Sequence, residues 1–568
     1  MPSDSNTGRC NDVRDPSLVE AIALKYCSPR LEHPPDRGEV TEASVLSARV
    51  GAFTKCAANQ KEKAVQSPRK RKESDVSIAT EHPLRRPDRF FIGGKWVEPS
   101  SQAMIDVIDS NNEELYFRVS EAREADMDRA ITAARDAFDD GPWPRLTHVQ
   151  RAEYLQALAA EIRRRSDVLA DIWPRESGGL YSAAKGQAGH AAGILEYFAS
   201  LADNYAWEEP AEPTGGGNFG LRVQEPVGVV GAIIPWNVPL FLALYKLSPA
   251  LLTGCTAVLK ASPEAPGAAY IIAESVEAVG LPDGVVNVLT ADREVSELLV
   301  RDHRIDKIAF TGSTAAGRRI ATIMGERIGR YTLELGGKSA AIILDDADLA
   351  SAAATIASTE CRLSGQVCAL LTRLVVTRSR HDEFVELLAG FFSQKKVGDA
   401  FDESNDMGPL AMERQRDRVE GYIAKGIAEG GKLVTGGGRP QGLDRGYFIE
   451  PTVFANVDNS DTIAREEIFG PVLTVIAADD EADAVRIAND TIYGLNASVF
   501  TPDIDRARAV AGQLRSGTVG HNATRTDFGI GFGGFKQSGI GRAGSRQGLL
   551  PYLESKTVIL DGPPERYR

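Results

Sequence analysis

The sequence predicts an α/β fold with at least two open, mostly parallel sheets, and three observations support this prediction. The chain has 568 residues, of which 43% are hydrophobic, so it can form more than one domain with a large core. Helix-like and strand-like runs alternate beyond residue 84. The strand-like runs are short and mostly apolar, a pattern typical of parallel strands that are buried on both faces.

The helix-like runs come first along the chain. Residues 126–140 ("DMDRAITAARDAFDD") and 151–172 ("RAEYLQALAAEIRRRSDVLADI") have helical spacing and are rich in Ala and long side chains. Short Val- and Ile-rich runs then predict strands at Val227–Ile234, Ala257–Leu259, Val285–Leu289, Lys307–Phe310, Ala340–Leu344 and Leu374–Val376. The segment 206–226 is polar and rich in Gly and Pro, and it predicts a hairpin.

One uncharged stretch, residues 227–245, has the length of a membrane span. Pro235 and Pro239 interrupt it and would break a lone helix in lipid. We therefore expect a buried strand, a turn and a second apolar element that starts at Leu240, and no membrane span.

The acidic net charge argues against two classes of partner. Lys and Arg number 65 against 79 Asp and Glu, a formal charge of −14. We therefore expect the body of the protein to bind neither nucleic acid nor an anionic membrane. The six cysteines form no CxxC pair and the seven histidines no HExxH, so no metal site is expected. So few cysteines also favour a reducing, cytoplasmic location.

Residues 1–83 differ in composition from the rest of the chain. They hold Cys10, Cys27 and Cys56, show no sustained apolar period and contain charged, Pro-containing stretches such as "EHPPDRGE". This composition predicts an N-terminal extension without stable order.

A glycine turn follows one of the predicted strands. "KIAFTGSTAAG" changes from strand to helix through Gly312, Ser313 and Gly317. Free N–H groups and the positive end of the helix dipole at such a turn can hold a phosphate, and Ser313 adds a hydroxyl donor. The spacing is GxxxxG and differs from the GxGxxG of the Rossmann fingerprint, so by itself it also fits a simple strand-to-helix turn.

Three further residues have side chains suited to catalysis. Cys368, in "SGQVCALLTR", is either a buried packing residue or a thiol nucleophile. Glu334, in "LELGGKS", is either a solvated strand end or a buried general base with a raised pKa. Asn237, in "PWNVP", is either an Asx-turn residue or a donor to an oxyanion. Taken singly, each pattern favours the structural role.

Six motifs taken together indicate more. "PWNVP", "FTGSTAAG", "LELGGKS", "GQVC", "EEIFGPV" and "GFGGFKQSGIGR" occur in this order. On these motifs the chain resembles the aldehyde dehydrogenase superfamily, from about residues 89–97 to 554–560. The resemblance implies two open parallel-sheet α/β domains, one of them Rossmann-like, and a small β oligomerisation flap.

The resemblance also implies a reaction, the oxidation of an aldehyde to the carboxylic acid with NAD(P)+. The Cys368 thiolate would attack the aldehyde carbon, and the Asn237 amide and the Cys368 backbone N–H would hold the oxyanion. Loss of hydride would leave a thioester, which water activated by Glu334 would hydrolyse. Family members that pass the acyl group to coenzyme A usually lack this glutamate. A coenzyme A-acylating enzyme is therefore one alternative, and a non-catalytic binding protein on the same scaffold is the other.

Cofactor contacts follow from the same resemblance. Lys260 would reach the adenosine ribose, and Trp236 and Ser313 the pyrophosphate. Glu467 would bind the nicotinamide ribose, and Phe469 would lie against the nicotinamide ring.

One departure from the family pattern concerns the choice of cofactor. Members that prefer NAD often carry Glu three residues after the lysine. Pro263 occupies that position here, and Glu264 follows one place later. We expect NAD as the cofactor, and NADP stays open.

The residues that match the lining of the family's aldehyde tunnel are apolar in this sequence, apart from the hydroxyl of Tyr245. In the family, the aldehyde tunnel is lined by residues that match Val238, Leu242, Tyr245, Val367, Ala369 and Phe532. No charge enters this set, which suits an aliphatic or aromatic aldehyde. Arg525, in the loop before "GFGG", is either a contact for a substrate carboxylate or a solvated loop residue.

The family's arrangement predicts three domains. An NAD(P)-binding domain would span 84–205 and 227–336, and a catalytic domain 337–545. Segments 206–226 and 546–562 would form the oligomerisation flap. Because such a flap exposes sheet edges, we expect a homodimer or homotetramer.

Overall fold

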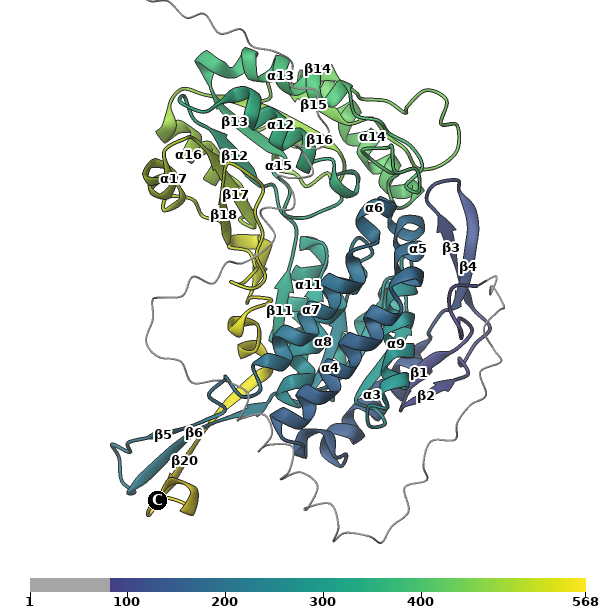
Figure 1. Ribbon diagram of the computed structural model, residues 1–568, viewed down its shortest axis with the longest axis vertical. Helices are drawn as coiled ribbons and strands as arrows, with labels where there is room; N and C mark the ends of the chain where they lie inside the picture. The colour runs from purple at the N-terminus through teal and green to yellow at the C-terminus, as the bar shows by residue number, and fades with distance from the viewer. Residues whose placement is uncertain (1–81) are drawn as a thin grey trace, which may run out of the picture. The chain divides into compact units, whose positions relative to one another are not determined.

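A computed structural model describes residues 82–568 of the chain. The predicted N-terminal extension, residues 1–83, lies outside the described residues except for His82 and Pro83. The described part is α/β, as the sequence predicts, with two large, mostly parallel sheets and two small antiparallel ones (Figure 1).

The first large sheet has eight strands in the order β19-β11-β10-β7-β8-β9-β1-β2. Its five central strands are parallel, and antiparallel pairing adds β19 at one end and β1 and β2 at the other. Every residue of β7, β8, β9 and β10 is buried, as the apolar runs predict. The strand bounds are β1 Phe90–Ile92, β2 Lys95–Val97, β7 Val229–Ile233, β8 Thr256–Ala261, β9 Val286–Thr290, β10 Lys307–Thr311, β11 Arg330–Glu334 and β19 Gly539–Ile540.

Helices cover both faces of this sheet. α4, α7, α8 and α9 lie across one face (Figure 1), and α3, α10 and α11 pack against the other. Their bounds, with those of the neighbouring α5 and α6, are α3 Glu124–Asp139, α4 His148–Arg164, α5 Ser166–Ser177, α6 Tyr181–Ala184, α7 Gln187–Ser200, α8 Pro239–Thr253, α9 Gly267–Val279, α10 Arg293–Arg301 and α11 Thr314–Glu326.

The second large sheet has seven strands in the order β14-β15-β16-β13-β12-β17-β18, all parallel except β14. Helices α12 and α13 pack on one face, and α14 to α17 on the other. The bounds are β12 Ala340–Ile343, β13 Arg373–Thr377, β14 Lys432–Thr435, β15 Thr452–Ala455, β16 Val472–Ala478, β17 Asn496–Phe500, β18 Thr518–His521, α12 Leu349–Thr359, α13 His381–Ser393, α14 Glu413–Ala428, α15 Thr462–Arg465, α16 Glu481–Asn489 and α17 Ile504–Ala511.

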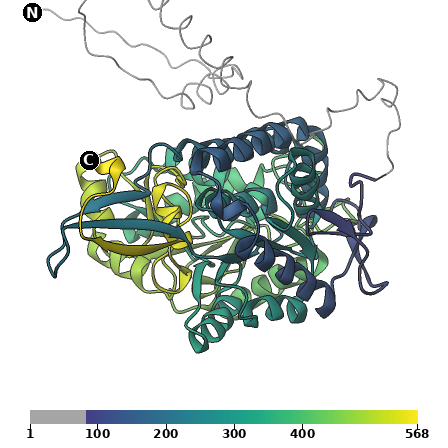
Figure 2. The same cartoon turned by 90° about the horizontal axis from the view of Figure 1, so that it is seen from below.

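Two small antiparallel sheets complete the described part. β3 (Met104–Asp109) pairs with β4 (Glu114–Ser120). The hairpin predicted at 206–226 forms from β5 (Glu208–Ala211) and β6 (Phe219–Pro226), and β20 (Leu553–Leu560) adds a third strand along the whole of β6. Figure 2 shows these strands side by side although they come from distant parts of the chain. β5 and β20 form the edges of this sheet.

The uncharged stretch at 227–245 folds as predicted. It forms β7, a turn, and then the start of α8, whose first residue is Pro239. Proline is tolerated there because the first turn of a helix needs no N–H donor. Among residues 82–568, no helix is long and apolar enough to cross a membrane.

The helical run predicted over 151–172 is divided in the structure. α4 ends and α5 begins at Arg165, whose backbone (φ −100°, ψ 19°) leaves the helical region. The Arg165 guanidinium, itself buried, meets Glu274 of α9 with Nη1 and Oε2 2.6 Å apart. The break lets α4 and α5 both pack on α9, a tertiary contact that helical spacing does not reveal.

We expect Glu274→Ala to destabilise the protein by up to about 3–5 kcal/mol, because it removes the more buried of the two carboxylates that pair with the buried Arg165 cation and leaves Glu161 as its only partner among the described residues. Glu274 is only 2% exposed, and it also accepts a hydrogen bond from the Arg85 backbone N–H (2.9 Å). Urea unfolding of both proteins measures the difference. Glu277→Ala, at an exposed position of the same helix, is the matched control. Equal unfolding midpoints for the two variants would contradict the expected role of the pair.

Candidate active site

The loop that carries Cys368 lies between α12 and β13 and is held in an unusual conformation. Leu363, Ser364 and Gly365 all have left-handed backbones, with φ of 49°, 53° and 75°. A Cβ at Gly365 would overlap the Gly470 carbonyl group, so only glycine fits. Ser364 Oγ donates to the carbonyl oxygens of Gly408 (2.7 Å) and Pro409 (3.0 Å). The loop is thus fixed against two distant segments of the second sheet's domain.

Gln366 joins this loop to the turn that holds Asn237. The Asn237 Nδ2 donates to the Gln366 carbonyl oxygen (2.9 Å). The Gln366 side chain in turn accepts from the Ala411 N–H (2.9 Å) and donates to the Ser177 carbonyl (3.2 Å). An amide nitrogen carries two N–H donors, so one donor of Asn237 stays available to a ligand. Sequence analysis quoted "GQVC" as a motif and missed this role of Gln366.

The paired glycines after Glu334 bring three of the predicted site residues together, Glu334, Cys368 and Glu467. Glu334 is the last residue of β11. A Cβ at Gly336 would overlap Glu467 Oε2, and a Cβ at Gly337 would lie 2.5 Å from the Cys368 carbonyl oxygen. The Gly337 N–H also donates to Glu467 Oε1 (3.0 Å). The absence of side chains at these two positions therefore allows Cys368 and Glu467 to lie at the end of the strand that presents Glu334.

Burial shapes the acid–base properties of this cluster. Glu334 is 8% exposed, and neither of its carboxylate oxygens has a hydrogen-bond partner among the described residues. Burial raises the pKa of Glu334 to about 8, against the opposing charges of Lys246 and Arg542. Burial, with the charges of Glu467 and Glu334, raises the pKa of the Cys368 thiol to about 12. The arrangement thus contains an uncommitted carboxylate that can exchange a proton near neutral pH.

Lys246 is a second residue that sequence analysis missed. It lies on α8 beside Tyr245, and its Nζ donates to Thr311 Oγ1 (2.5 Å). Burial lowers the pKa of Lys246, while the charge of Glu334 favours its protonated form. Its signal in the sequence is that it alone carries a charge in the long apolar run from 227 to 259.

Predicted cofactor residues gather at one edge of the first sheet. Trp236 follows β7, Lys260 lies near the end of β8, and Gly312 and Ser313 follow β10. The carboxyl ends of these parallel strands meet at the same edge. Ser313 caps α11, with its Oγ accepting from the Ala316 N–H (3.2 Å).

Gly317 and Lys260 shape the packing and the charge at that edge of the sheet. A Cβ at Gly317 would lie 2.6 Å from Leu335 side-chain atoms, so this glycine lets α11 approach the sheet. Burial lowers the pKa of Lys260 to about 8, against the opposing charges of Glu264 and Asp292. Glu264 accepts from the Ser262 hydroxyl and forms an ion pair with Arg414 of α14. Glu264, which lies one residue after the position where the family often has Glu, is therefore already paired with Ser262 and Arg414.

These residues fit a pyridine dinucleotide. The N-terminus of the 13-residue helix α11, which follows β10, offers a positive dipole end to a diphosphate, and Lys260 supplies a buried cation near the end of β8, two strands away in the sheet. Trp236, at the same edge, forms an edge-to-face pair with Phe469, with ring centroids 5.4 Å apart. Among residues 82–568, no three His, Cys, Asp or Glu side chains gather into a possible metal site.

Two of the predicted substrate residues, Ala369 and Phe532, lie in an apolar cluster with Cys368. Phe532 and Ala369 form a small buried cluster with Leu495, against which Cys368 and Phe528 pack. Leu242 and Tyr245 lie three residues apart on α8, so they share one face of the helix. The two remaining residues are half-buried, Val238 at the start of α8 and Val367 next to Cys368. Sequence analysis missed Phe528, because nothing in the exposed loop before "GFGG" marks this ring as a packing residue.

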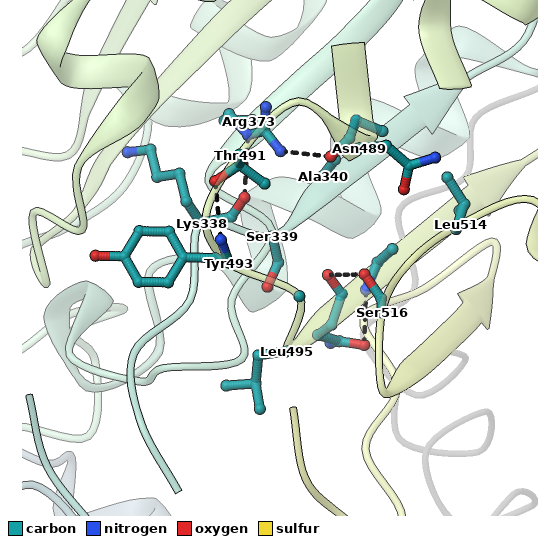
Figure 3. Close-up of a pocket in the computed structure, with 14 residues that line it drawn as sticks. Lys338, Ser339, Ala340, Arg373, Asn489, Thr491, Tyr493, Leu495, Leu514 and Ser516 are labelled. Carbon is teal, nitrogen blue, oxygen red and sulfur yellow. Dashed lines mark hydrogen bonds between the residues drawn. The ribbon is translucent and has the colours of Figure 1, made fainter. Parts of the chain in front are cut away.

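Arg373 holds the backbone at Lys338, the residue that follows the glycine pair (Figure 3). Its guanidinium donates to the carbonyl oxygens of Lys338 (3.0 Å), Ile487 (3.0 Å) and Ala488 (2.8 Å). The last two belong to the final turn of α16, where a cation is favourable. A cavity of about 10 Å³, room for one water, lies beside this contact. In Figure 3 the Lys338 ammonium points away from Leu514 and Ser516.

Comparison with known proteins gives one consistent result. Residues 96–558 match the family model described as "Aldehyde dehydrogenase family". The chain is 42% identical over 474 residues to geranial dehydrogenase of Castellaniella defragrans, covering 83% of this chain and 98% of that protein. It is 39% identical over 475 residues to betaine aldehyde dehydrogenase of Brucella canis, covering 83% and 96%.

Solved structures agree with the sequence comparisons. A Mycobacterium tuberculosis aldehyde dehydrogenase complexed with NAD+ superposes with a TM-score of 0.81 at 45% identity, over 83% of this chain and 98% of that one. A mutant of Pseudomonas syringae aldehyde dehydrogenase C, complexed with NAD+ and octanal, superposes with a TM-score of 0.81 at 38% identity, over 85% and 99%.

Proposed function

The chain belongs to the aldehyde dehydrogenase family, and we propose that Cys368, Glu334 and Asn237 perform its reaction as nucleophile, general base and oxyanion donor. The protein is an NAD(P)-dependent oxidoreductase that converts an aldehyde into the carboxylic acid. The observation that carries the residue assignment is the meeting of Cys368 and Glu467 at the glycine pair that follows Glu334.

The first step forms a bond between Cys368 Sγ and the aldehyde carbon. Because burial and two carboxylates raise the pKa of the thiol, its proton must leave as the bond forms. We propose that this proton passes to water, because Glu334 is assigned to the hydrolysis step alone. The free N–H of the Asn237 amide and the Cys368 backbone N–H stabilise the oxyanion that develops on the former carbonyl oxygen. Bound NAD+ would supply the hydride acceptor. Loss of hydride from the former aldehyde carbon leaves the acyl group on Cys368 as a thioester.

The second step is hydrolysis of that thioester. Glu334, in its ionised form, removes a proton from water, which attacks the acyl carbon and releases the carboxylic acid and the Cys368 thiol. Lys246 favours the ionised form of Glu334 through its charge. A buried general base of this kind supports hydrolysis, and nothing favours transfer of the acyl group to coenzyme A.

The cofactor residues are proposed on the same grounds. Lys260 contacts the adenosine ribose, and Trp236 and Ser313 contact the pyrophosphate, with Gly312 and Gly317 shaping the turn. Burial raises the pKa of Glu467 to about 7, against the hydrogen bond from the Gly337 N–H. Glu467 Oε1 is held by this hydrogen bond, and we propose that its other oxygen, Oε2, binds the nicotinamide ribose hydroxyls, with Phe469 beside the ring. NAD is the cofactor in the solved relatives, and we propose it as the preferred one.

We propose an apolar aldehyde as the substrate. Val238, Leu242, Val367, Ala369 and Phe532 contribute no polar side-chain atom to the wall near Cys368, and Tyr245 adds a single hydroxyl. A charged substrate would lose its hydration there without a partner. Two of the relatives act on or bind apolar aldehydes by name, geranial and octanal.

The assembly and the location are also proposals. The outer edges of β5 and β20 are suited to pairing with a second copy of the chain, in a homodimer or homotetramer. The two parallel-sheet regions would act as a cofactor domain (84–205 and 227–336) and a catalytic domain (337–545), and the three-stranded sheet as the flap (206–226 and 546–562). A cytoplasmic location accords with the scarcity of cysteine.

One experiment tests the proposed function. The purified protein is supplied with NAD+ or NADP+ and with octanal, benzaldehyde or a carboxylated aldehyde, and formation of the reduced cofactor is followed. We expect NADH without added coenzyme A, with higher kcat/KM for the two apolar aldehydes. A strict requirement for coenzyme A would establish the acylating alternative. Cofactor binding without turnover of any aldehyde would favour the non-catalytic one.

A further inference from the structure

The backbone that follows Cys368 is held at two nearby points. Asn496, buried at the start of β17, donates from Nδ2 to the Ala369 carbonyl oxygen (2.8 Å). The Leu371 N–H donates to Glu360 Oε2 (2.7 Å). Glu360 is the C-terminal cap of α12, directly before the loop of Cys368. This carboxylate therefore closes the loop of the nucleophile onto the helix from which the loop starts.

Glu360 is a buried carboxylate that neither step of the proposed reaction uses. It is 1% exposed. Its second oxygen, Oε1, accepts from the Thr524 hydroxyl and lies 3.0 Å from Thr359 Oγ1. Burial raises the pKa of Glu360, and the hydrogen bonds from Thr524, Thr359 and Leu371 oppose this effect. Hydrogen bonds to a buried carboxylate are strong, and an oxygen that loses its donor there has no water to replace it.

Thr524 belongs to a second loop, residues 522–531, which follows β18 and carries Phe528 to the apolar cluster that contains Cys368. The start of this loop is held to β17, where the Ser498 hydroxyl donates to the Ala523 carbonyl oxygen (2.9 Å). Beyond Thr524, residues 525–527 are exposed. Thr524 thus holds the loop to the interior just before the chain turns toward solvent.

One side chain therefore joins the two loops that meet at the nucleophile. One oxygen of Glu360 binds the backbone just after Cys368, and the other binds the loop 522–531. These segments are far apart in the sequence, so the distance between them depends on this contact and on the packing around it.

We infer that Glu360 is a positioning residue, which fixes the Cys368 thiol and backbone N–H relative to the loop 522–531 by joining the Leu371 N–H to the Thr524 hydroxyl. The inference rests on the proposed function, because it assumes that the aldehyde carbon reacts at Cys368. Displacement of a reacting group by about 1 Å can lower a rate about a hundredfold. Loss of the link should therefore slow the attack on the aldehyde without weakening the binding of NAD+.

The test uses single turnovers, with NAD+-loaded enzyme in saturating excess over octanal. The rate constant of NADH formation then reports the steps up to hydride loss. We expect Thr524→Val, which keeps the side-chain shape and removes the donor, to lower this rate constant about tenfold. Thr524→Ser restores the hydroxyl and should return the rate constant to within about twofold of the wild type. Thr526→Val, at an exposed position of the same loop, should behave like the wild type.

Glu360→Gln completes a double-mutant cycle with Thr524→Val. Glutamine offers one acceptor oxygen in place of two, so we expect the rate constant to fall by about 10–100-fold. Because both substitutions break the same link, the double variant should be no slower than Glu360→Gln alone. The affinity for NAD+, measured by calorimetric titration, should keep the wild-type value in all variants.

The outcomes distinguish positioning from a merely structural role. A wild-type rate constant in Thr524→Val, or separate effects that multiply in the double variant, overturns the inference even if the unfolding midpoint falls. The rate constant at saturation does not depend on the fraction of folded enzyme, so partial misfolding does not mimic the expected result. If Glu360→Gln does not fold, the two Thr524 variants decide the question by themselves.

The same experiment separates this inference from the function on which it rests. NADH formation by the wild type at a rate that the variants share overturns the role of Glu360 and leaves the proposed function standing. Failure of the wild type to form NADH from octanal or any other aldehyde overturns both.

Discussion

Cys368→Ala is expected to abolish aldehyde oxidation while NAD+ binding persists. Without the thiol there is no covalent adduct from which hydride can leave, so turnover should fall by at least about 10⁴-fold. The substitution removes one sulfur atom from a partly buried position, and the residues proposed to bind the cofactor lie at other strand ends and loops. NADH formation with an apolar aldehyde measures the first effect, and calorimetric titration with NAD+ measures the second.

Cys361→Ala is the matched control for this prediction. Cys361 lies in the same loop region but is buried in the apolar cluster between α12 and α13, and burial raises the pKa of its thiol to about 12. We expect Cys361→Ala to retain turnover. Full activity in Cys368→Ala would show that another group is the nucleophile.

Glu334→Gln is expected to separate the two steps of the reaction. Glutamine has nearly the same shape but cannot accept a proton from water, so hydrolysis of the thioester should slow by about 10²–10⁴-fold. Rapid mixing should then show a burst of NADH of about one equivalent per active site, followed by a stall. Glu326→Gln, at an exposed position of α11, should turn over like the wild type. A Glu334→Gln variant with the wild-type steady rate would exclude Glu334 as the base.

The same residue predicts the pH dependence of turnover. Burial raises the pKa of Glu334 to about 8, so below that pH most molecules hold the protonated, neutral carboxyl, which cannot accept a proton. Steady-state turnover of the wild type should therefore rise as the pH increases through about 8 and then level off. The residual turnover of Glu334→Gln should lack this rise. Wild-type turnover that stays constant from about pH 6 to about pH 9 would contradict the assignment of Glu334 as the base.

Local pattern accounts for much of what could be predicted about the fold. The runs around Val229–Ile233 and Lys307–Thr311 are apolar throughout or nearly so, because strands covered on both faces by helices leave no position for solvent. The turn at Gly312 and Ser313 could be placed between strand and helix, because glycine and a capping serine have specific backbone roles. Where a distant partner decides the backbone, as at Arg165, the pattern predicted a continuous helix and was wrong.

The features of the candidate site also fall into those that the sequence predicts and those that only the structure shows. The motifs alone indicated Cys368, Glu334 and Asn237 as chemically suited residues, and their order along the chain indicated the family. The sequence by itself therefore determined which groups are present, which elements carry them and which reaction class they suit. Only the tertiary structure decided that Gln366 joins the Cys368 loop to Asn237, that Lys246 lies near enough for its charge to act on Glu334, and that Phe528 packs in one apolar cluster with Cys368. These contacts join residues far apart in the chain, and their energies depend on packing and burial that no local run of residues specifies.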